Sequence, residues 1–388
     1  MDLRKKIFLI NLLPIVLISL NLRLPITSVG PAVELLQEHY GLNATQIGAL
    51  TSLPLVAFGV VAFIVAYFAP IRAMFVALLL LVFGEIVRSI GGSALLFVGT
   101  AIMGSGIAVA NVLLPTFVKA KFPRNVPKIM GLYSLLLNIS AALGIALILP
   151  LCYLLPLPLA MASWVIVALC AIISFLPQIK NSRLIRKKPK SSIQKSLFAQ
   201  PTAWKVTLFM ALSSTMAYCF FSWYHALVRS FGYDEAFASH MMLLAQCSII
   251  PVAYFVPVIL GSISRRFKPF FMGGICGGYV LVYMLLLFFG EHTWVVGFSS
   301  FLVGVPVGGA FGVALLFIST KSANVAIATK LSAMAQGVGY LIAALGPLLL
   351  GGLYDYFGGF SEALLVLVGL GVLLCTLGLV ASRARVIE

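Results

Sequence analysis

The sequence predicts an all-α membrane protein in which twelve transmembrane helices form two pseudo-symmetric six-helix bundles. Of the 388 residues, 62% are hydrophobic and 9% are charged, and the mean hydropathy is +1.11. Soluble domains are about half apolar and a quarter charged. The apolar residues stand in runs of about 20, the length that crosses a bilayer as a helix. A polar, basic segment separates the runs into two sets of six.

The apolar runs set the expected helices, because lipid offers the backbone no hydrogen-bond partner and a helix satisfies its own. The first bundle is expected from helices near residues 7–33, 47–68, 72–90, 94–118, 128–154 and 160–177. The second bundle is expected from helices near residues 204–228, 238–260, 269–289, 293–318, 330–353 and 362–381. The expected domains are therefore residues 1–178 and 204–388, joined by a basic cytoplasmic linker at 179–203.

The distribution of charge predicts the orientation in the membrane. A net charge of +16 would suit a nucleic-acid binder, but the basic residues lie between the apolar runs. With both termini in the cytoplasm, all but Arg23, Arg88 and Arg229 of the 26 Lys and Arg residues fall on the cytoplasmic face, as the positive-inside rule requires. We therefore expect cytoplasmic termini in a lipid bilayer and no nucleic-acid partner. We also expect a monomer.

Patterns typical of enzymes, nucleotide sites and metal sites are missing from the sequence. The six cysteines lie inside apolar runs without C-x-x-C spacing, so we expect neither disulfides nor a metal site. The four histidines are scattered near helix ends, which argues against a membrane enzyme or receptor. The mid-helix glycines lack a following Lys-Ser/Thr, so they predict no nucleotide site. We expect no cofactor, no nucleotide and no enzymatic activity.

A weak internal repeat relates the two halves. Residues 128–144 (KIMGLYSLLLNISAALG) align with residues 330–346 (KLSAMAQGVGYLIAALG), and each segment places Ala-Ala-Leu-Gly 13 residues after its lysine. Gly104 similarly matches Gly304. Repeats of this kind are typical of transporters built from two related bundles, which hold the substrate near the middle of the membrane.

Local motifs carry a resemblance to a known family. The motifs are Asn21-Leu-Arg-Leu-Pro25, residues 50–59 (LTSLPLVAFG), Gly84-Glu-Ile-Val-Arg88, residues 104–115 (GSGIAVANVLLP) and residues 334–340 (MAQGVGY). With the division into six and six helices, they resemble the major facilitator superfamily, and within it the cyanate and 2-nitroimidazole transporter (CynX/NimT) branch. The resemblance implies a bacterial inner-membrane secondary transporter that works by alternating access. The sequence departs from the superfamily in the loop between the second and third helices, which is shortened to Ala69-Pro-Ile-Arg72.

Arg23 is the principal candidate for binding the solute. It lies past the middle of the first expected helix, where a charge costs about 2.5 to 3.5 kcal/mol unless a partner or a wet cavity compensates it. The guanidinium stays protonated, so the residue favours a small anionic or electron-rich solute. The alternative is a structural tie from Arg23 to backbone carbonyls of neighbouring helices.

Glu85 and Arg88 stand three residues apart on the third expected helix. This spacing places both side chains on one helix face and predicts a structural ion pair near the outer surface. The alternative is that Arg88 reaches the solute. Because Glu85 is the one acid well inside an expected helix, the sequence does not favour a broad-specificity cation exporter, although a multidrug or metabolite exporter of the same superfamily stays the alternative function.

Amides and aromatic rings at membrane depth complete the candidates. Hydrogen bonding between helices and simple packing are the alternative roles for such side chains. The further solute-binding candidates are Asn111, Tyr133, Asn138, Gln336 and Tyr340. His225, near the outer end of the seventh expected helix, can titrate near neutral pH and is the candidate for proton coupling.

Overall fold

The computed structural model describes residues 3–42, 44–65, 68–180 and 197–388, and nearly all of them are helical. The chain divides into two compact units. Unit 1 comprises Met1–Pro123 and Leu136–Ser196, and unit 2 comprises Arg124–Leu135 and Leu197–Glu388. Most of the expected linker, residues 181–196, lies outside the described residues.

Unit 1 contains long helices together with three short ones. They are α1 (Leu3–Asn21), α2 (Leu24–Thr27), α3 (Val33–Tyr40), α4 (Ala44–Val65), α5 (Pro70–Val87), α6 (Ser93–Lys121), α7 (Val126–Leu154), α8 (Leu157–Ala162) and α9 (Val165–Lys180). The first turns of α7, up to Leu135, group with unit 2. The helix α3 ends on Gly41, whose φ of 64° is a left-handed conformation that glycine adopts without strain.

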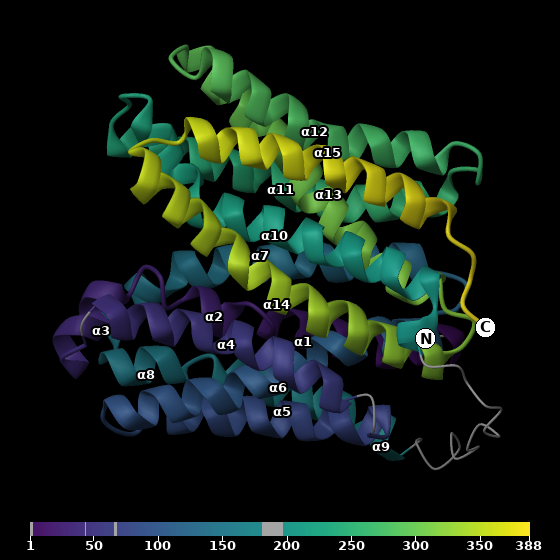
Figure 1. Cartoon of the computed structure of the whole chain (residues 1–388). Coiled ribbons are helices and arrows are strands. Elements are labelled where there is room, and N and C mark those ends of the chain that lie inside the picture. The colour runs from purple at the N-terminus through teal and green to yellow at the C-terminus, as the bar shows by residue number, and fades with distance from the viewer. Residues whose placement is uncertain (1–2, 43, 66–67, 181–196) are drawn as a thin grey trace. The chain divides into compact units, whose positions relative to one another are not determined.

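Unit 2 consists of six long helices after a short 3₁₀ turn at Leu197–Ala199. They are α10 (Pro201–Ser230), α11 (Glu235–Ser262), α12 (Lys268–Phe289), α13 (Thr293–Thr320), α14 (Val325–Phe357) and α15 (Ser361–Arg383). Beyond α15 the chain turns back, and Ser322 and Ile387 form an isolated bridge between backbone segments. Figure 1 colours these helices from teal to yellow.

The described helices include eleven segments that are long and apolar enough to cross a membrane, and α4 adds a shorter apolar stretch, Ala49–Val65. Large apolar side chains such as Ile173 and Leu348 are exposed, whereas the charged side chains of Glu85 and Arg88 are buried. This inverted distribution is the one that a lipid solvent requires. The predicted all-α membrane fold with twelve spanning segments is therefore confirmed.

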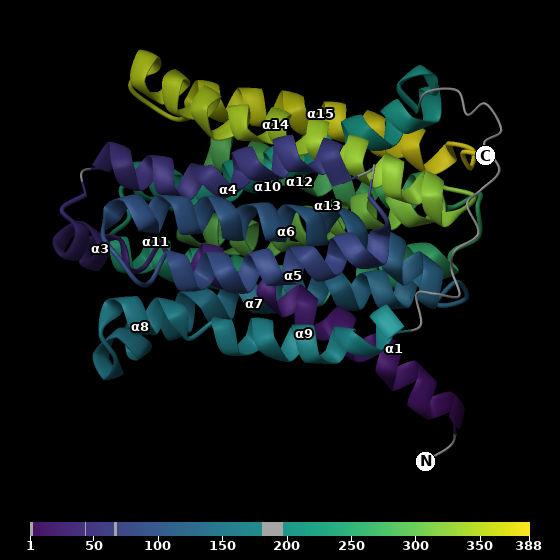
Figure 2. The same cartoon turned by 90° about the horizontal axis from the view of Figure 1, so that it is seen from below.

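The two units repeat the same packing scheme. In unit 1 α6 packs against α4 and α5, and in unit 2 α13 packs against α11 and α12. Figures 1 and 2 both show α5 and α6 side by side. Gly104 of α6 faces Pro54 of α4, while Gly304 of α13 faces Ser248 of α11. The two glycines that match in the sequence repeat thus lie at equivalent helix crossings, where a small residue lets the backbones approach.

The structure corrects two of the expected helices. The helix expected at 7–33 is broken, because α1 ends at Asn21 and α2 begins at Leu24. The helix expected at 160–177 is divided into α8 and α9 at Ser163 and Trp164. Pro25 accounts for the first break, since proline has no N–H and its ring clashes with the carbonyl four residues earlier in a continuing helix.

Candidate functional site

The break between α1 and α2 lies inside a membrane span, Phe8–Thr27. Arg23 immediately precedes α2, with φ −124° and ψ −34°, and its side chain is half-buried. Its carbonyl oxygen accepts hydrogen bonds from the N–H groups of Ile26 (3.0 Å) and Thr27 (2.9 Å). The interruption therefore places a residue with a permanent positive charge at a helix end within the membrane.

The helix α7 satisfies the backbone groups that the break exposes. The N–H of Leu24 donates to the Ser140 hydroxyl (3.0 Å), and that hydroxyl donates to the carbonyl oxygen of Leu20 (2.6 Å). The Thr27 hydroxyl donates to the carbonyl oxygen of Ala141 (3.1 Å). A broken helix persists in a membrane only when neighbouring groups replace its lost hydrogen bonds, and Ser140 does this for both ends of the gap.

Arg88 also contacts the break. It follows α5 directly and is fully buried. Its guanidinium donates to the carbonyl oxygens of Pro25 in α2 (3.0 Å) and Met161 in α8 (3.3 Å). The two terminal nitrogens thus have carbonyl acceptors, whereas Nε has no hydrogen-bond partner among the described residues. A buried cation needs such acceptors, and through them Arg88 connects α2, α5 and α8.

The direct ion pair expected between Glu85 and Arg88 is replaced by these carbonyl contacts. Within the described ranges the one ion pair closer than 4.0 Å joins Arg229 and Glu235. Glu85 is fully buried, and neither of its carboxyl oxygens has a hydrogen-bond partner among the described residues. The three-residue spacing places Glu85 and Arg88 on one face, where their charges interact although no nitrogen–oxygen contact between these two described side chains is shorter than 4.0 Å.

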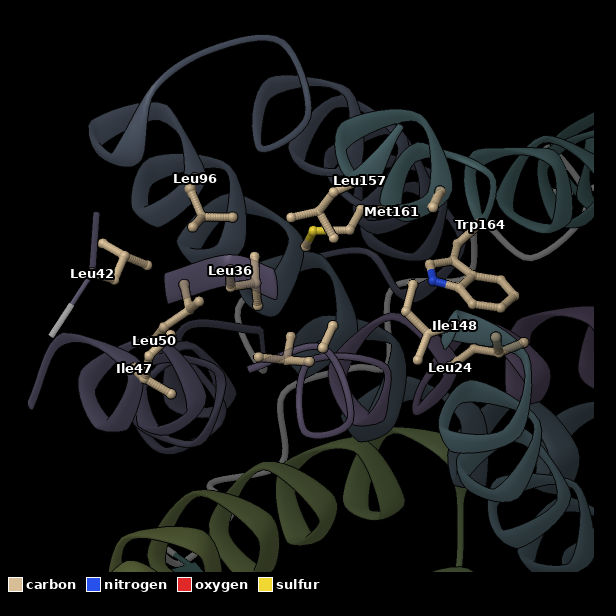
Figure 3. Close-up of a cluster of buried hydrophobic side chains, with 13 residues drawn as sticks. Leu24, Leu36, Leu42, Ile47, Leu50, Leu96, Ile148, Leu157, Met161 and Trp164 are labelled. Carbon is tan, nitrogen blue, oxygen red and sulfur yellow. The ribbon is translucent and has the colours of Figure 1, made fainter. Parts of the chain in front are cut away.

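An apolar cluster surrounds this polar arrangement, and Figure 3 shows its side chains. The labelled members are Leu24, Leu36, Leu42, Ile47, Leu50, Leu96, Ile148, Leu157, Met161 and Trp164, all buried. In the figure Trp164 lies near Ile148 and Leu24, beside the start of α2. Met161 supplies one of the Arg88 acceptors, and Leu24 precedes Pro25, which supplies the other. The buried cluster therefore shields the guanidinium hydrogen bonds from competing solvent.

The remaining candidates divide between the two units. In unit 1 Asn111 is buried in α6, and Asn138 is half-buried in α7. In unit 2 Tyr133, Gln336 and Tyr340 are buried.

Within unit 2, Gln336 and Tyr340 stand one helical turn apart on α14. The Gln336 amide donates to the Ser332 hydroxyl (2.9 Å). The Tyr340 ring meets the Tyr218 ring of α10 edge to face, with their centroids 6.4 Å apart. The structure thus brings an aromatic pair close to the Gln336 amide, on the two helices α10 and α14 that pack together.

His225 lies on α10 and contacts α11. Its Nε2 is 3.3 Å from the hydroxyl of Ser239, in an exposed position. This contact joins the two helices near the end of α10, where the sequence places the histidine. The neighbouring Tyr224 is buried instead, and its hydroxyl hydrogen-bonds with that of Ser300 (2.7 Å).

Sequence reasoning missed Ser140, Thr27 and the carbonyl acceptors of Arg88. Ser140 lies in the repeated segment that also contains Gly144, and it aligns with Ile342 of the other half. A polar residue aligned with an apolar one was the sequence signal that could have identified Ser140. The acceptors carried no signal, because every residue has a carbonyl group.

Comparison with known proteins decides the family. The family model described as Major Facilitator Superfamily matches residues 15–344. The 2-nitroimidazole transporter of Escherichia coli is 33% identical over 389 residues, covering 96% of this chain and 95% of the relative. The chain belongs to the major facilitator superfamily. The cyanate transport protein CynX of the same organism is 26% identical over 368 residues, covering 90% of this chain and 91% of the relative.

A solved superfamily structure supports the fold. The proton:xylose symporter XylE, bound to 6-bromo-6-deoxy-D-glucose, superposes with a TM-score of 0.76 over 97% of this chain and 95% of the other. Only 13% of residues are identical, so the likeness concerns the fold alone. The resemblance to the cyanate and 2-nitroimidazole branch is confirmed by relatives that extend over nearly the whole chain.

Proposed function

We propose that this superfamily member is a secondary active transporter of a small anionic or electron-rich solute and works by alternating access. The observation that carries the proposal is Arg23 at the break of a membrane-spanning helix. Broken transmembrane helices are where transporters of several folds bind their substrates and ions. A planar guanidinium can donate hydrogen bonds to both oxygen atoms of a nitro group or a carboxylate.

The names of the relatives support the solute class. The bacterial relatives are called a 2-nitroimidazole transporter and a cyanate transport protein. A shorter match, 40% identical over 82 residues, is a putative anionic 4-hydroxybenzoate permease of Thauera aromatica. Nitro, cyanate and carboxylate groups all present electron-rich atoms, which a fixed cation attracts.

The other candidates take secondary roles in this proposal. Arg88 positions the break that carries Arg23, because its donors bind carbonyl groups on α2 and α8. The further candidates for solute binding are Asn111 and Asn138 in unit 1, and Tyr133, Gln336 and Tyr340 in unit 2. The protein acts as a monomer and catalyses no chemical conversion.

The decisive experiment measures binding to Arg23 variants. Purified protein is heated with increasing 2-nitroimidazole or cyanate, and the shift in unfolding temperature gives the affinity. Arg23→Lys should weaken binding by about 1 to 3 kcal/mol, the scale of a charged hydrogen bond, and Arg23→Gln should weaken it further. Arg72→Gln removes an exposed arginine at the start of α5 and serves as the matched control. If Arg23→Gln binds as tightly as the parent, Arg23 is a structural tie and the proposed preference fails.

We further propose that the protein lies in the bacterial inner membrane with both termini in the cytoplasm. The support is the placement of nearly all basic residues at one set of helix ends. A cysteine introduced at Ser191, which lies outside the described residues, should resist an impermeant thiol reagent in intact cells. The parent protein, with its six cysteines, gives the background labelling. Ready labelling from outside would reverse the proposed orientation.

A further inference from the structure

Unit 2 contains a cavity of about 320 Å³ whose lining carries three basic residues. Arg265 comes from the loop between α11 and α12, Lys268 from the first turn of α12, and Lys321 from the end of α13. The segment that follows α15 closes another side, with Ala384 and Val386 in the lining. No Asp or Glu is among the described residues that line the cavity. The cavity therefore combines a concentrated positive charge with apolar walls.

Lys321 is fixed in this cavity by backbone contacts. Its ammonium donates to the carbonyl oxygens of Ser382 (2.8 Å) and Ala384 (2.7 Å), and it lies 5.5 Å from the centroid of the Phe317 ring. The N–H of Ile387 donates to the Lys321 carbonyl oxygen (2.8 Å), which holds the segment after α15 against the end of α13. An ammonium has three donors, so one stays available for a ligand.

The charge on this ammonium lacks a neutralising acid. Among the described residues, no Asp or Glu oxygen lies within 4.0 Å of the Lys321 ammonium. Burial, and then the positive charges of Lys268 and Arg265, lower the pKa of Lys321 to about 8. Three cations held together without an acid repel one another, and an anion between them would relieve that repulsion.

The start of α12 adds to the attraction for an anion. No side chain caps the first turn of this 22-residue helix, which begins at Lys268 beside the cavity. Unsatisfied N–H groups and the helix dipole make such a terminus favourable for negative charge. Arg265 and Lys268 are thus supported by the backbone of the helix that follows them.

We propose that this cavity binds a phosphate group, carried by the headgroup of an anionic lipid or by a free phosphate anion. Three basic side chains match the charge and the acceptor oxygens of a phosphate. The apolar walls leave room for the rest of a lipid headgroup. At the end of unit 2 that the basic loops predict to be cytoplasmic, anionic lipids are the most abundant source of such groups. The site is independent of the proposed solute contact at Arg23.

The first test compares two adjacent arginines on the full-length protein. Purified protein in a neutral detergent is titrated with inorganic phosphate, with chloride at equal ionic strength as the reference, and binding is followed by the unfolding temperature. In a second arm the protein is placed in nanodiscs with increasing phosphatidylglycerol in phosphatidylcholine. Arg265→Gln should weaken phosphate-group binding about tenfold or more, since a charged hydrogen bond is worth at least one decade in affinity. Arg266→Gln is the matched control, because Arg266 is exposed and lies outside the lining.

The two arms distinguish the sources. A saturable response to phosphatidylglycerol that Arg265→Gln removes and Arg266→Gln keeps assigns the site to a lipid headgroup. The same pattern with inorganic phosphate alone assigns it to a free anion. If neither ligand gives a saturable response, or if both variants weaken binding equally, the proposal is overturned.

A pH series tests Lys321 itself. The phosphodiester of phosphatidylglycerol keeps its charge between pH 6 and 9, whereas Lys321, with a pKa of about 8, loses its proton as the pH rises through that value. The charged groups that face it are Arg265 and Lys268, while Arg383, Arg385 and Glu388 are exposed outside the lining. Binding should therefore weaken above about pH 8 in the parent and stay constant in Lys321→Arg. An identical pH profile in both proteins would show that Lys321 does not contact the ligand.

Discussion

The first transmembrane helix of unit 1 is broken, whereas the first helix of unit 2 is continuous. The chain leaves the helical path between Asn21 and Leu24, inside the span Phe8–Thr27. Its counterpart α10 runs without interruption over the 30 residues Pro201–Ser230. Pro25 stands in the first turn of α2, after the gap, and Pro201 stands in the first turn of α10; in both places the missing N–H costs nothing. A proline in a first turn thus follows the break in one unit and begins a continuous helix in the other.

The helices α7 and α14, which carry the two copies of the internal repeat, also differ. Ser140 of α7 and Ile342 of α14 occupy the same position of the internal repeat. The Ser140 hydroxyl bonds to backbone groups on both sides of the break, whereas Ile342 is 38% exposed and has no hydroxyl to offer. Unit 1 thus combines Pro25, Ser140 and Arg88 at its break, and this combination is not repeated in unit 2.

Among the variants that test this difference between the units, Arg88→Gln should lower the unfolding free energy most. Arg88→Gln removes two charge-assisted hydrogen bonds to buried carbonyl groups, each worth about 1.5 to 3 kcal/mol, so we expect a loss of about 3 to 6 kcal/mol in unfolding free energy. The measurement is thermal or denaturant unfolding of the purified protein. Arg72→Gln, at the exposed start of α5, should change little. Equal stability of the two variants would show that the Arg88 hydrogen bonds do not stabilise the broken helix.

Substitution of Gly144, the glycine of the repeat that packs against α2, should lower stability by the next largest amount. In Gly144→Ala the new methyl meets the Leu24 carbonyl oxygen at 2.6 Å, and such overpacking typically costs about 1 to 3 kcal/mol. In Gly346→Ala the methyl meets the side chains of Thr215 (2.6 Å) and Cys219 (2.8 Å). Because side chains rotate more easily than a backbone carbonyl moves, Gly346→Ala should lose less. A larger loss for Gly346→Ala would contradict the special role of the α2 backbone.

Removal of the bridging hydroxyl should have a smaller effect. Ser140→Ala leaves the Leu24 N–H and the Leu20 carbonyl without their partner, which should cost about 1 to 2 kcal/mol. The repeat-related variant Ile342→Ala serves as the control for shortening a side chain on the equivalent helix. Hydrogen exchange of the Leu24 amide should also accelerate in Ser140→Ala and not in Ile342→Ala. Unchanged exchange would show that the hydroxyl does not bridge the gap.

Replacement of His225 should have the smallest effect on stability and a specific effect on transport. The contact with Ser239 is exposed, so His225→Gln should change the unfolding free energy by less than about 0.5 kcal/mol. If His225 carries the driving proton, His225→Gln should abolish pH-driven accumulation of the solute and leave exchange intact. Accumulation that equals that of the parent would remove His225 from proton coupling.

The sequence was sufficient for the features that depend on hydropathy and on local pattern. Each transmembrane helix satisfies its own backbone, so a run of about 20 apolar residues defines a span without knowledge of its neighbours. The internal repeat was also detectable in the sequence, and the structure places its matching residues Gly104 and Gly304 at equivalent helix crossings. The expectation of one continuous helix at 7–33 was wrong, because the chain leaves the helical path between Asn21 and Leu24.

Only the tertiary structure decided which groups meet across helices. Glu85 and Arg88 share a helix face, yet the Arg88 guanidinium binds carbonyl oxygens of Pro25 and Met161, which are 63 and 73 residues away. The cavity around Lys321 likewise combines the ends of α7, α11, α12, α13 and α15 with the chain beyond α15. Carbonyl groups are present at every residue, and hydropathy does not encode the distances between helix ends. The length and number of the spans therefore follow from the sequence alone, while the partners of its buried charges follow from packing.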